Sequence, residues 1–136
     1  MSVFTAKEIE YLTGQPLGRL GTVQRSGVVQ VSPVGFRYVP ELDVIDIDGY
    51  NMSKSQKYRN VLSGGQATIT IDDLVSTNPW RIRCLEIRGV AEALNPPGPG
   101  EPDRAFIRIH PQRIIGLGVE DPAVPPHQLV ANARNV

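Results

Sequence analysis

One stretch of the chain is Asn51-Met52-Ser53-Lys54-Ser55-Gln56-Lys57-Tyr58-Arg59-Asn60-Val61-Leu62-Ser63-Gly64-Gly65, and it directly follows an apolar run typical of a buried strand. It predicts a short helix. Ser53 is a suitable N-cap, Gln56 three residues later completes a capping box, and the two glycines supply a left-handed stop. One face of this helix is expected to pack against the sheet, and its members are Tyr58, Val61 and Leu62.

Two lysines lie near the N-terminal end of this helix. Lys54 and Lys57 share one stripe, close to the unpaired N–H groups and partial positive charge of a helix start. Such a helix start can hold a phosphate group. The alternative is a solvated surface helix whose lysines bind nothing, which is the commoner case for an isolated basic helix. The neighbouring strands favour the phosphate site.

Period-two alternation of apolar and polar residues dominates the rest of the chain and predicts a mainly β protein. Pro111 is expected to interrupt the last strand, and Asp72-Asp73 is interpreted as a turn cap at a strand end. Tight turns are predicted at Arg25-Ser26-Gly27 and Pro40-Glu41. Six strands are expected, at about 17–24, 28–39, 42–50, 67–71, 81–94 and 105–119.

Six short strands and two short helices predict a small antiparallel barrel, because closure removes exposed sheet edges. The first helix is expected to begin with the capping box of Thr5 and Glu8 and to end near Gly14. A length of 136 residues suits a single domain, 1–136, with the barrel at about 17–119. The proline-containing tail, 120–136, lacks periodicity and is predicted either to lie over the surface or to be loosely ordered.

Charge and composition restrict the partners. Lys plus Arg and Asp plus Glu number 14 each, so no global field would recruit nucleic acid or an anionic membrane. The one Trp, four Tyr and three Phe are scattered, whereas barrels that bind single-stranded nucleic acid need a cationic groove with stacking aromatics. A single cysteine and the lack of a leader or long apolar span favour a cytoplasmic protein that binds a small molecule.

Residues for catalysis by the protein alone are not evident. Asp46 and Asp48 are accounted for as alternating polar positions of a strand, and Cys84 lacks the local signature of a nucleophile. Two histidines show no spacing typical of a metal site. We therefore assign no catalytic residue and no metal ligand. Any reactive chemistry is expected to belong to a bound cofactor.

Several motifs together resemble one known family, the split-barrel flavin and deazaflavin oxidoreductases related to pyridoxamine 5'-phosphate oxidase. They are most similar to the branch that uses the deazaflavin coenzyme F420, over roughly 17–119. Two features depart from the pattern: the Asn95–Gly100 connection is a short Pro/Gly loop where many relatives have a helix, and Leu117 replaces an expected aromatic. The motifs are Gln30–Phe36, Lys57-x-x-Asn60-x-Leu62, Thr70–Leu74, Asn78–Arg81, Leu85–Glu92 and Ile107–Ile115.

The resemblance implies a six-stranded antiparallel split β-barrel of the FMN-binding type that forms a homodimer with two cofactor sites at the interface. By the same resemblance, Lys57 would hold the cofactor phosphate, with Lys54 as a second charge and Ser53, Ser55 and Asn60 as hydrogen-bond donors. The cofactor ring would be lined by Val31, Ser32, Pro33 and Val34 and bordered by Tyr50, Asn51 and Met52. Trp80 would form a wall of the neighbouring subunit's pocket, or else plug the core, and Arg81 would face an anionic cofactor tail.

The implied activity is transfer of a hydride from reduced coenzyme F420 to an electron-poor C=C, C=N or C=O bond of a small molecule. Two alternatives remain open at this stage. One is an FMN-dependent oxidoreductase of the same fold, and the other is a non-catalytic carrier of the cofactor. The two departures from the family pattern both concern the substrate pocket, so the substrate is the property least defined by the resemblance.

Overall fold

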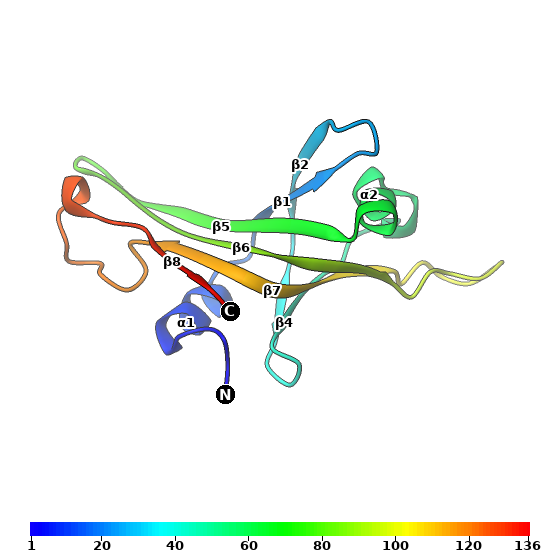
Figure 1. The fold of residues 1–136 in the computed structure, drawn as a ribbon, viewed down its shortest axis with the longest axis horizontal. Coiled ribbons are helices and arrows are strands. Elements are labelled where there is room, and N and C mark those ends of the chain that lie inside the picture. The colour runs from blue at the N-terminus through cyan, green and yellow to red at the C-terminus, as the bar shows by residue number, and fades with distance from the viewer.

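The computed structural model describes residues 1–136 and is mainly β, as predicted (Figure 1). Its helices are α1 (Ala6–Gly14) and α2 (Gln56–Gly64), with 3₁₀ turns η1 (Met52–Lys54) and η2 (Pro126–Gln128). The strands are β1 (Gly18–Val23), β2 (Val29–Val34), β3 (Arg37–Val39), β4 (Val44–Ile47), β5 (Gln66–Thr77), β6 (Trp80–Leu94), β7 (Phe106–Leu117) and β8 (Asn132–Asn135). None of the helices is long and apolar enough to cross a bilayer.

All strands belong to one antiparallel sheet in the order β2-β1-β5-β6-β7-β4-β3, with β8 paired to β7. The two end strands, β2 and β3, are not hydrogen-bonded to each other, so the expected barrel is not closed. They are nevertheless consecutive in the chain, separated only by Gly35 and Phe36. The sheet therefore curls, and its two end strands are connected by the main chain at Gly35 and Phe36 instead of by a ladder of hydrogen bonds.

The prediction of six strands is wrong, because the structure contains eight. The predicted strand 28–39 divides at Gly35-Phe36 into β2 and β3, which pair with different neighbours at opposite ends of the sheet. The other additional strand, β8, forms in the tail 120–136. Pairing of β8 with β7 satisfies backbone groups at that edge, so this part of the tail is an ordered strand, which its lack of periodicity did not predict.

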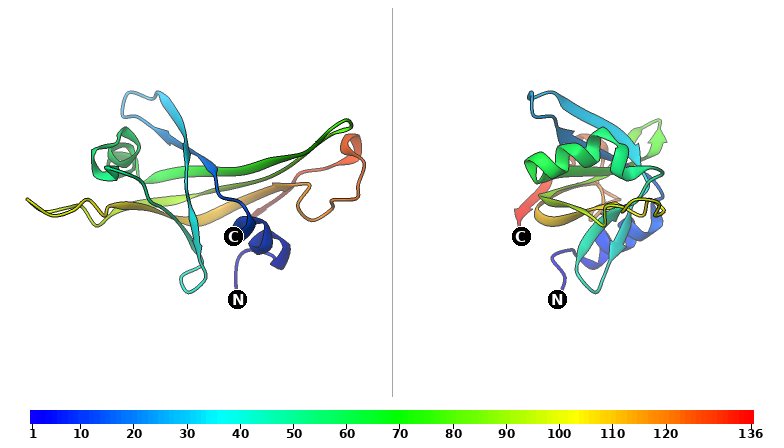
Figure 2. Two further views of the ribbon diagram at one scale, coloured as in Figure 1. Left: turned by 180° about the vertical axis from the view of Figure 1, so that it is seen from behind. Right: turned by 90° about the vertical axis from the view of Figure 1, so that its right-hand side faces the viewer.

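Three long strands, β5, β6 and β7, run along the molecule, and β1, β2 and β4 cross them at a steep angle (Figures 1 and 2). The alternation seen in the sequence turns one face of these strands inward, and many of its side chains are completely buried. Helix α2 lies at one end of the long strands, where β5 begins. The turn between β5 and β6 lies at the other end. The fully buried aliphatic residues include Ile45, Ile47, Ile69, Ile71, Leu85, Ile87, Ile107 and Ile109.

β7 runs through Pro111 without the break that the sequence predicts there. The register between β6 and β7 shifts at this point, from Arg88 opposite Arg113 to Gly89 opposite Pro111, which is a β-bulge. A Cβ on Gly89 would lie 1.9 Å from the carbonyl oxygen of His110, so only glycine fits there. The bulge with its facing glycine lets β7 continue through a residue that has no N–H to donate.

The pair Asp72-Asp73 does not cap a turn, as had been predicted, but lies within β5. Each carboxylate faces an arginine of a neighbouring strand, Arg19 of β1 for Asp72 and Arg83 of β6 for Asp73. These cross-strand ion pairs allow two adjacent acidic residues in a strand. By contrast, the predicted turn at Gly27 is confirmed, with φ at 93°, which glycine tolerates without strain.

Candidate functional site

The entry to α2 differs in detail from the prediction. Ser55, not Ser53, is the N-cap of α2, and its Oγ accepts a hydrogen bond from the Tyr58 amide at 3.2 Å. Ser53 lies one turn earlier, in η1, where both its amide and its hydroxyl donate to Oδ2 of Asp103, at 3.1 and 2.6 Å. A long-range carboxylate therefore binds the amide and the hydroxyl that the local pattern had assigned to a capping box. The predicted left-handed stop at Gly65 is confirmed, with φ at 67°.

Lys57, the predicted phosphate ligand, is the second residue of α2 and is half-buried. Among the 14 Lys and Arg side chains, four make neither a hydrogen bond nor an ion pair, and they are Arg25, Lys54, Lys57 and Arg104. The other three are exposed to solvent. Lys57 is thus the partly buried cation that lacks a counter-ion. Because partial burial of an unpaired charge is unfavourable, this is the position where an anionic ligand gains most.

Asn60 is almost completely buried between α2 and the first two strands. Its Nδ2 donates to Oγ1 of Thr22 at 3.0 Å and to Oε1 of Gln30 at 3.2 Å, and its Oδ1 accepts from Nε2 of Gln56 at 2.7 Å. The amide of this predicted donor is therefore engaged with the protein. These bonds connect α2 to β1 and β2, which fixes where the start of the helix lies relative to β2.

Strand β2 presents the residues predicted to line a cofactor ring. It is an end strand that pairs on one edge only, with β1, and Val31 and Pro33 are exposed while Val34 is buried. Oγ of Ser32 is buried and has no hydrogen-bond partner. A buried hydroxyl without a partner is costly, and native structures rarely keep one unless a ligand or water satisfies it. Strand β2 therefore offers an unpaired edge, exposed apolar side chains and one unsatisfied hydroxyl.

The connection from β4 to α2 contains three further predicted residues, which lie in different surroundings. Tyr50 is fully exposed, and Asn51 adopts a left-handed conformation with φ at 53°. Met52 is 1% exposed and belongs to the hydrophobic core. Of the three, only Tyr50 and Asn51 present side chains to the surface. Met52 anchors the turn, and its carbonyl accepts a hydrogen bond from Oγ of Ser55 at 2.7 Å.

Trp80 and Arg81 lie at the start of β6, at the opposite end of the long strands from α2 (Figure 1). Trp80 is 62% exposed, so it is not a core plug. Nη1 of Arg81 donates to the carbonyl oxygens of Pro122 and Val124, at 2.6 and 2.9 Å, which ties the turn to the C-terminal segment. A single chain therefore does not bring these two residues together with Lys57.

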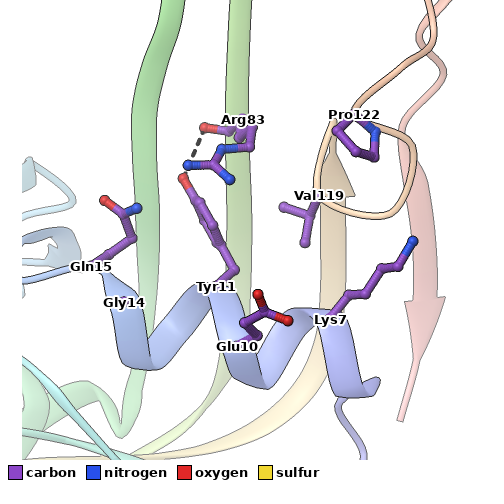
Figure 3. A pocket seen from close by; sticks show the side chains of 8 residues that line it. All are labelled: Lys7, Glu10, Tyr11, Gly14, Gln15, Arg83, Val119 and Pro122. Atoms are coloured by element: carbon purple, nitrogen blue, oxygen red, sulfur yellow. Dashed lines mark hydrogen bonds between the residues drawn. The ribbon is translucent and has the colours of Figure 1, made fainter.

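Sequence reasoning missed a hollow of about 400 Å³ beside α1 (Figure 3). Residues at helical spacing on α1 form one wall of the hollow. Arg83 of β6 and the segment 119–122 form the other walls. Because α1 and β6 are far apart in the sequence, no local motif marks the hollow. The residues of its α1 wall are Lys7, Glu10, Tyr11, Gly14 and Gln15.

A hydrogen-bonded cluster supports one side of this hollow. Arg83 binds Asp73 through Nε at 3.0 Å and Nη2 at 2.8 Å, and its guanidinium carbon lies 4.9 Å from the centre of the Tyr11 ring. The Tyr11 hydroxyl lies 2.7 Å from Oδ1 of Asp73. Burial, followed by the hydrogen bond to Asp73, raises the pKa of Tyr11 far above its usual value, so the phenol stays protonated. The hydrogen bond from Arg83 lowers the pKa of Asp73.

Sequence comparison decides the family. The sequence profile of pyridoxamine 5'-phosphate oxidase matches residues 4–118. The chain belongs to the pyridoxamine 5'-phosphate oxidase family. It is similar to the 5a,11a-dehydrotetracycline/5a,11a-dehydrooxytetracycline reductase of Streptomyces rimosus, with 41% identity over 121 residues that cover 86% of this chain and 84% of the reductase. It is accordingly an oxidoreductase of that family.

Solved structures of the pyridoxamine 5'-phosphate oxidase family have the same fold. A protein described as an F420 reductase superimposes with a TM-score of 0.58 at 25% identity, over 77% of this chain and 94% of its own. A pyridoxamine 5'-phosphate oxidase-related, FMN-binding protein of Nostoc punctiforme gives a TM-score of 0.67 at 12% identity, over 100% of this chain and 98% of its own. The second likeness concerns the fold alone.

Proposed function

We propose that this chain is a reductase that uses reduced deazaflavin coenzyme F420 as its hydride donor. The observation that carries the proposal is Lys57, a half-buried cation with no counter-ion at the start of α2. The family assignment and the similarity to an F420 reductase support it. When bound, the cofactor would supply the hydride, and the protein would supply position and electrostatics.

The residues present fit a flat, anionic cofactor. Lys57 would bind its phosphate, assisted by the second charge of Lys54 near the start of α2. The orphan hydroxyl of Ser32 would gain a partner from the ring edge, and the exposed side chains of Val31 and Pro33 would pack against the ring face. Ser53 and Ser55, by contrast, could donate to the phosphate only after releasing Asp103 and the Met52 carbonyl, because their hydroxyls are engaged there.

A homodimer would complete the site. Trp80 and Arg81 are far from Lys57 within one chain, so only a second copy can place them beside the cofactor. The turn between β5 and β6 is flanked by exposed apolar side chains, Leu74 and Val75, and β2 exposes Val29 and Val31. Apolar patches of this kind mark interaction sites. We therefore propose that the Trp80 turn of one protomer packs beside β2 and α2 of its partner.

The proposed substrate is a small electron-poor molecule with a polarised C=C bond conjugated to a carbonyl group. The Streptomyces rimosus relative is a reductase of dehydrotetracyclines, and its similarity covers most of both chains. The proposed reaction adds the hydride to one carbon of the double bond, and a proton from solvent completes the reduction. Groups on the protein would bind and orient the substrate and exclude water from the ring face.

Equilibrium titration tests the cofactor assignment. Purified protein is titrated with coenzyme F420 and, in matched buffer, with FMN, and binding is followed by the cofactor fluorescence. Replacement of Lys57 by Ala removes a charge-assisted contact and should weaken F420 binding by about 1.5–3 kcal/mol, or roughly tenfold or more. The matched control is Arg25→Ala, which removes another unpaired cation from the turn between β1 and β2 and should change affinity by less than about threefold.

The same titration separates the alternatives. Protein that purifies yellow, releases FMN on denaturation and ignores F420 would contradict the proposal and favour an FMN enzyme. Tight F420 binding without turnover on enone, quinone or dehydrotetracycline substrates would favour a cofactor carrier. F420 binding that is unaffected by Lys57→Ala would mean that the phosphate lies elsewhere.

A further inference from the structure

The hollow beside α1 contains charges of both signs that the protein leaves unpaired. The carboxylate of Glu10 has no ion-pair or hydrogen-bond partner, although Lys7 lies three residues before it on the same helix. Nζ of Lys7 instead donates to the backbone carbonyl of Glu120 at 3.0 Å. Figure 3 shows Glu10 directed into the space between α1 and the segment that carries Val119.

Further donors and acceptors face the same space. Nε and Nη2 of Arg83 are taken by Asp73, but Nη1 has no acceptor. The side-chain amide of Gln15 also lacks a partner in the protein and points upward from the end of α1 (Figure 3). The hollow thus offers an unpaired carboxylate, two cationic groups with spare donors and one amide. With Arg83 neutralised by Asp73, Lys7 and Glu10 leave the hollow with no net charge.

This combination matches a zwitterion better than a simple anion or cation. A protonated amine would meet Glu10, while an ionised enol or carboxylate would meet Lys7 and the free edge of Arg83. The hollow also lies on the half of β6 that begins with Trp80, which the proposed dimer places beside the partner's cofactor site. A ligand held there would extend toward that site.

We propose that this hollow binds the zwitterionic end of the substrate, a molecule that carries a protonated amine close to an ionised enol or carboxylate. This inference rests on the proposed reductase function for the class of ligand. It assigns binding roles to Glu10 and Lys7, which no sequence motif had indicated. Tyr11 has a positioning role, because its hydroxyl and ring hold Asp73 and Arg83 in place.

Gly14 allows the hollow to be filled without disturbing the fold. It is the last residue of α1, and a Cβ built on it would meet no heavy atom within 4 Å. Its φ is not in the left-handed region, and phenylalanine is a better helix former than glycine. Gly64, the last residue of α2, has the same properties and lies outside the hollow. Gly64→Phe is therefore a matched control for Gly14→Phe.

Calorimetric titration of the full chain, without cofactor, tests the inference. The probes are tetracycline, which has a dimethylammonium group beside an acidic enol, and 4-dedimethylamino-tetracycline, which lacks the amine. Gly14→Phe should weaken tetracycline binding by about tenfold or more through steric exclusion, while Gly64→Phe should leave it within about twofold. Glu10→Gln should weaken tetracycline by about fivefold and leave the amine-free probe unchanged.

Several outcomes would overturn the inference. They are saturable tetracycline binding that Gly14→Phe does not affect, an equal effect of Glu10→Gln on both probes, and no saturable binding to the unmodified chain up to millimolar concentration. If Gly14→Phe fails to fold by circular dichroism, the two-probe comparison with Glu10→Gln decides alone. Titration of Gly14→Phe with F420 tests the proposed function separately from the inference about the hollow. The affinity of this variant for the cofactor should equal that of the unmodified chain.

Discussion

The contact between Arg134 and Glu8 leads to the sharpest stability prediction. Glu8 lies in α1 with a side chain that is 2% exposed, and Arg134 of β8 binds both its carboxylate oxygens, at 2.6 and 3.0 Å. Nη2 of Arg134 also donates to the carbonyl of Val3 at 2.7 Å. The change to consider is Arg134→Met, which keeps much of the side-chain volume but leaves a buried carboxylate without its cation.

The magnitude follows from the burial of the carboxylate. Loss of one partner from a buried ion pair costs about 3–5 kcal/mol, because the remaining charge is desolvated and uncompensated. Two features reduce this value here. Arg134 is 28% exposed, and Glu8 keeps a hydrogen bond from the Thr5 amide at 2.8 Å. We therefore expect Arg134→Met to lower the free energy of unfolding by about 2–3 kcal/mol, with a fall in Tm of roughly 6–15 °C.

Urea denaturation and thermal melts measure this loss, and a double-mutant cycle identifies its cause. Glu8→Gln combined with Arg134→Met removes both charges and should be less destabilised than Arg134→Met alone. The control is Arg113→Met, because Arg113 binds Asn135 of the same strand pair through an exposed hydrogen bond, and it should change stability by less than about 1 kcal/mol. Arg134→Met within about 0.5 kcal/mol of the unmodified chain would refute the reasoning.

Two further predictions concern β6. Gly89→Ala should prevent folding or lower Tm sharply, because its Cβ would lie 1.9 Å from the carbonyl oxygen of His110. The control Gly21→Ala should be tolerated, because its Cβ would make only an ordinary contact at 3.6 Å. Equal melting curves for the two variants would contradict the steric argument. The ion pair with Arg83 lowers the pKa of Asp73 below its ordinary value of 3.8, so the stability it contributes is present above about pH 4 and is lost as the pH falls through the lower folded-state pKa. Asp73→Asn should flatten this acid limb of a stability-against-pH curve, and an unchanged limb would show that other groups cause it.

Local features were predictable from the sequence because they depend on residues a few positions apart. The capping box of Thr5 and Glu8 forms as expected, with Glu8 binding the Thr5 amide and Thr5 binding the Glu8 amide. Glu86 and Arg88, two positions apart in the sequence, form an ion pair on one face of β6. The buried face of β6 also follows the predicted alternation. The basic start of α2 lies near its predicted position for the same reason.

The errors share a different origin, since each involves a partner far away in the chain. Ser53 does not cap α2, because Asp103, fifty residues later, takes both its donors. The strand in the tail was not predicted, because no local pattern reveals that Arg134 reaches Glu8, 126 positions away. Asp103 follows the Asn95–Gly100 loop in the connection before β7, so the region next to this departure from the family pattern supports the candidate cofactor site.

By itself, the sequence determined the mainly β composition, the two helices with the capping box of the first and the glycine stop of the second, the turn at Gly27 and the likeness to the split-barrel oxidoreductases, because these follow from short-range periodicity and motif spacing. Only the tertiary structure decided that the strand 28–39 divides between the two ends of an open sheet, that Lys57 has no counter-ion, and that α1 and β6 enclose a charged hollow. Such properties depend on which groups, distant in the sequence, come into contact after the sheet has curled. Short stretches of sequence contain no pattern that predicts these contacts across the sheet.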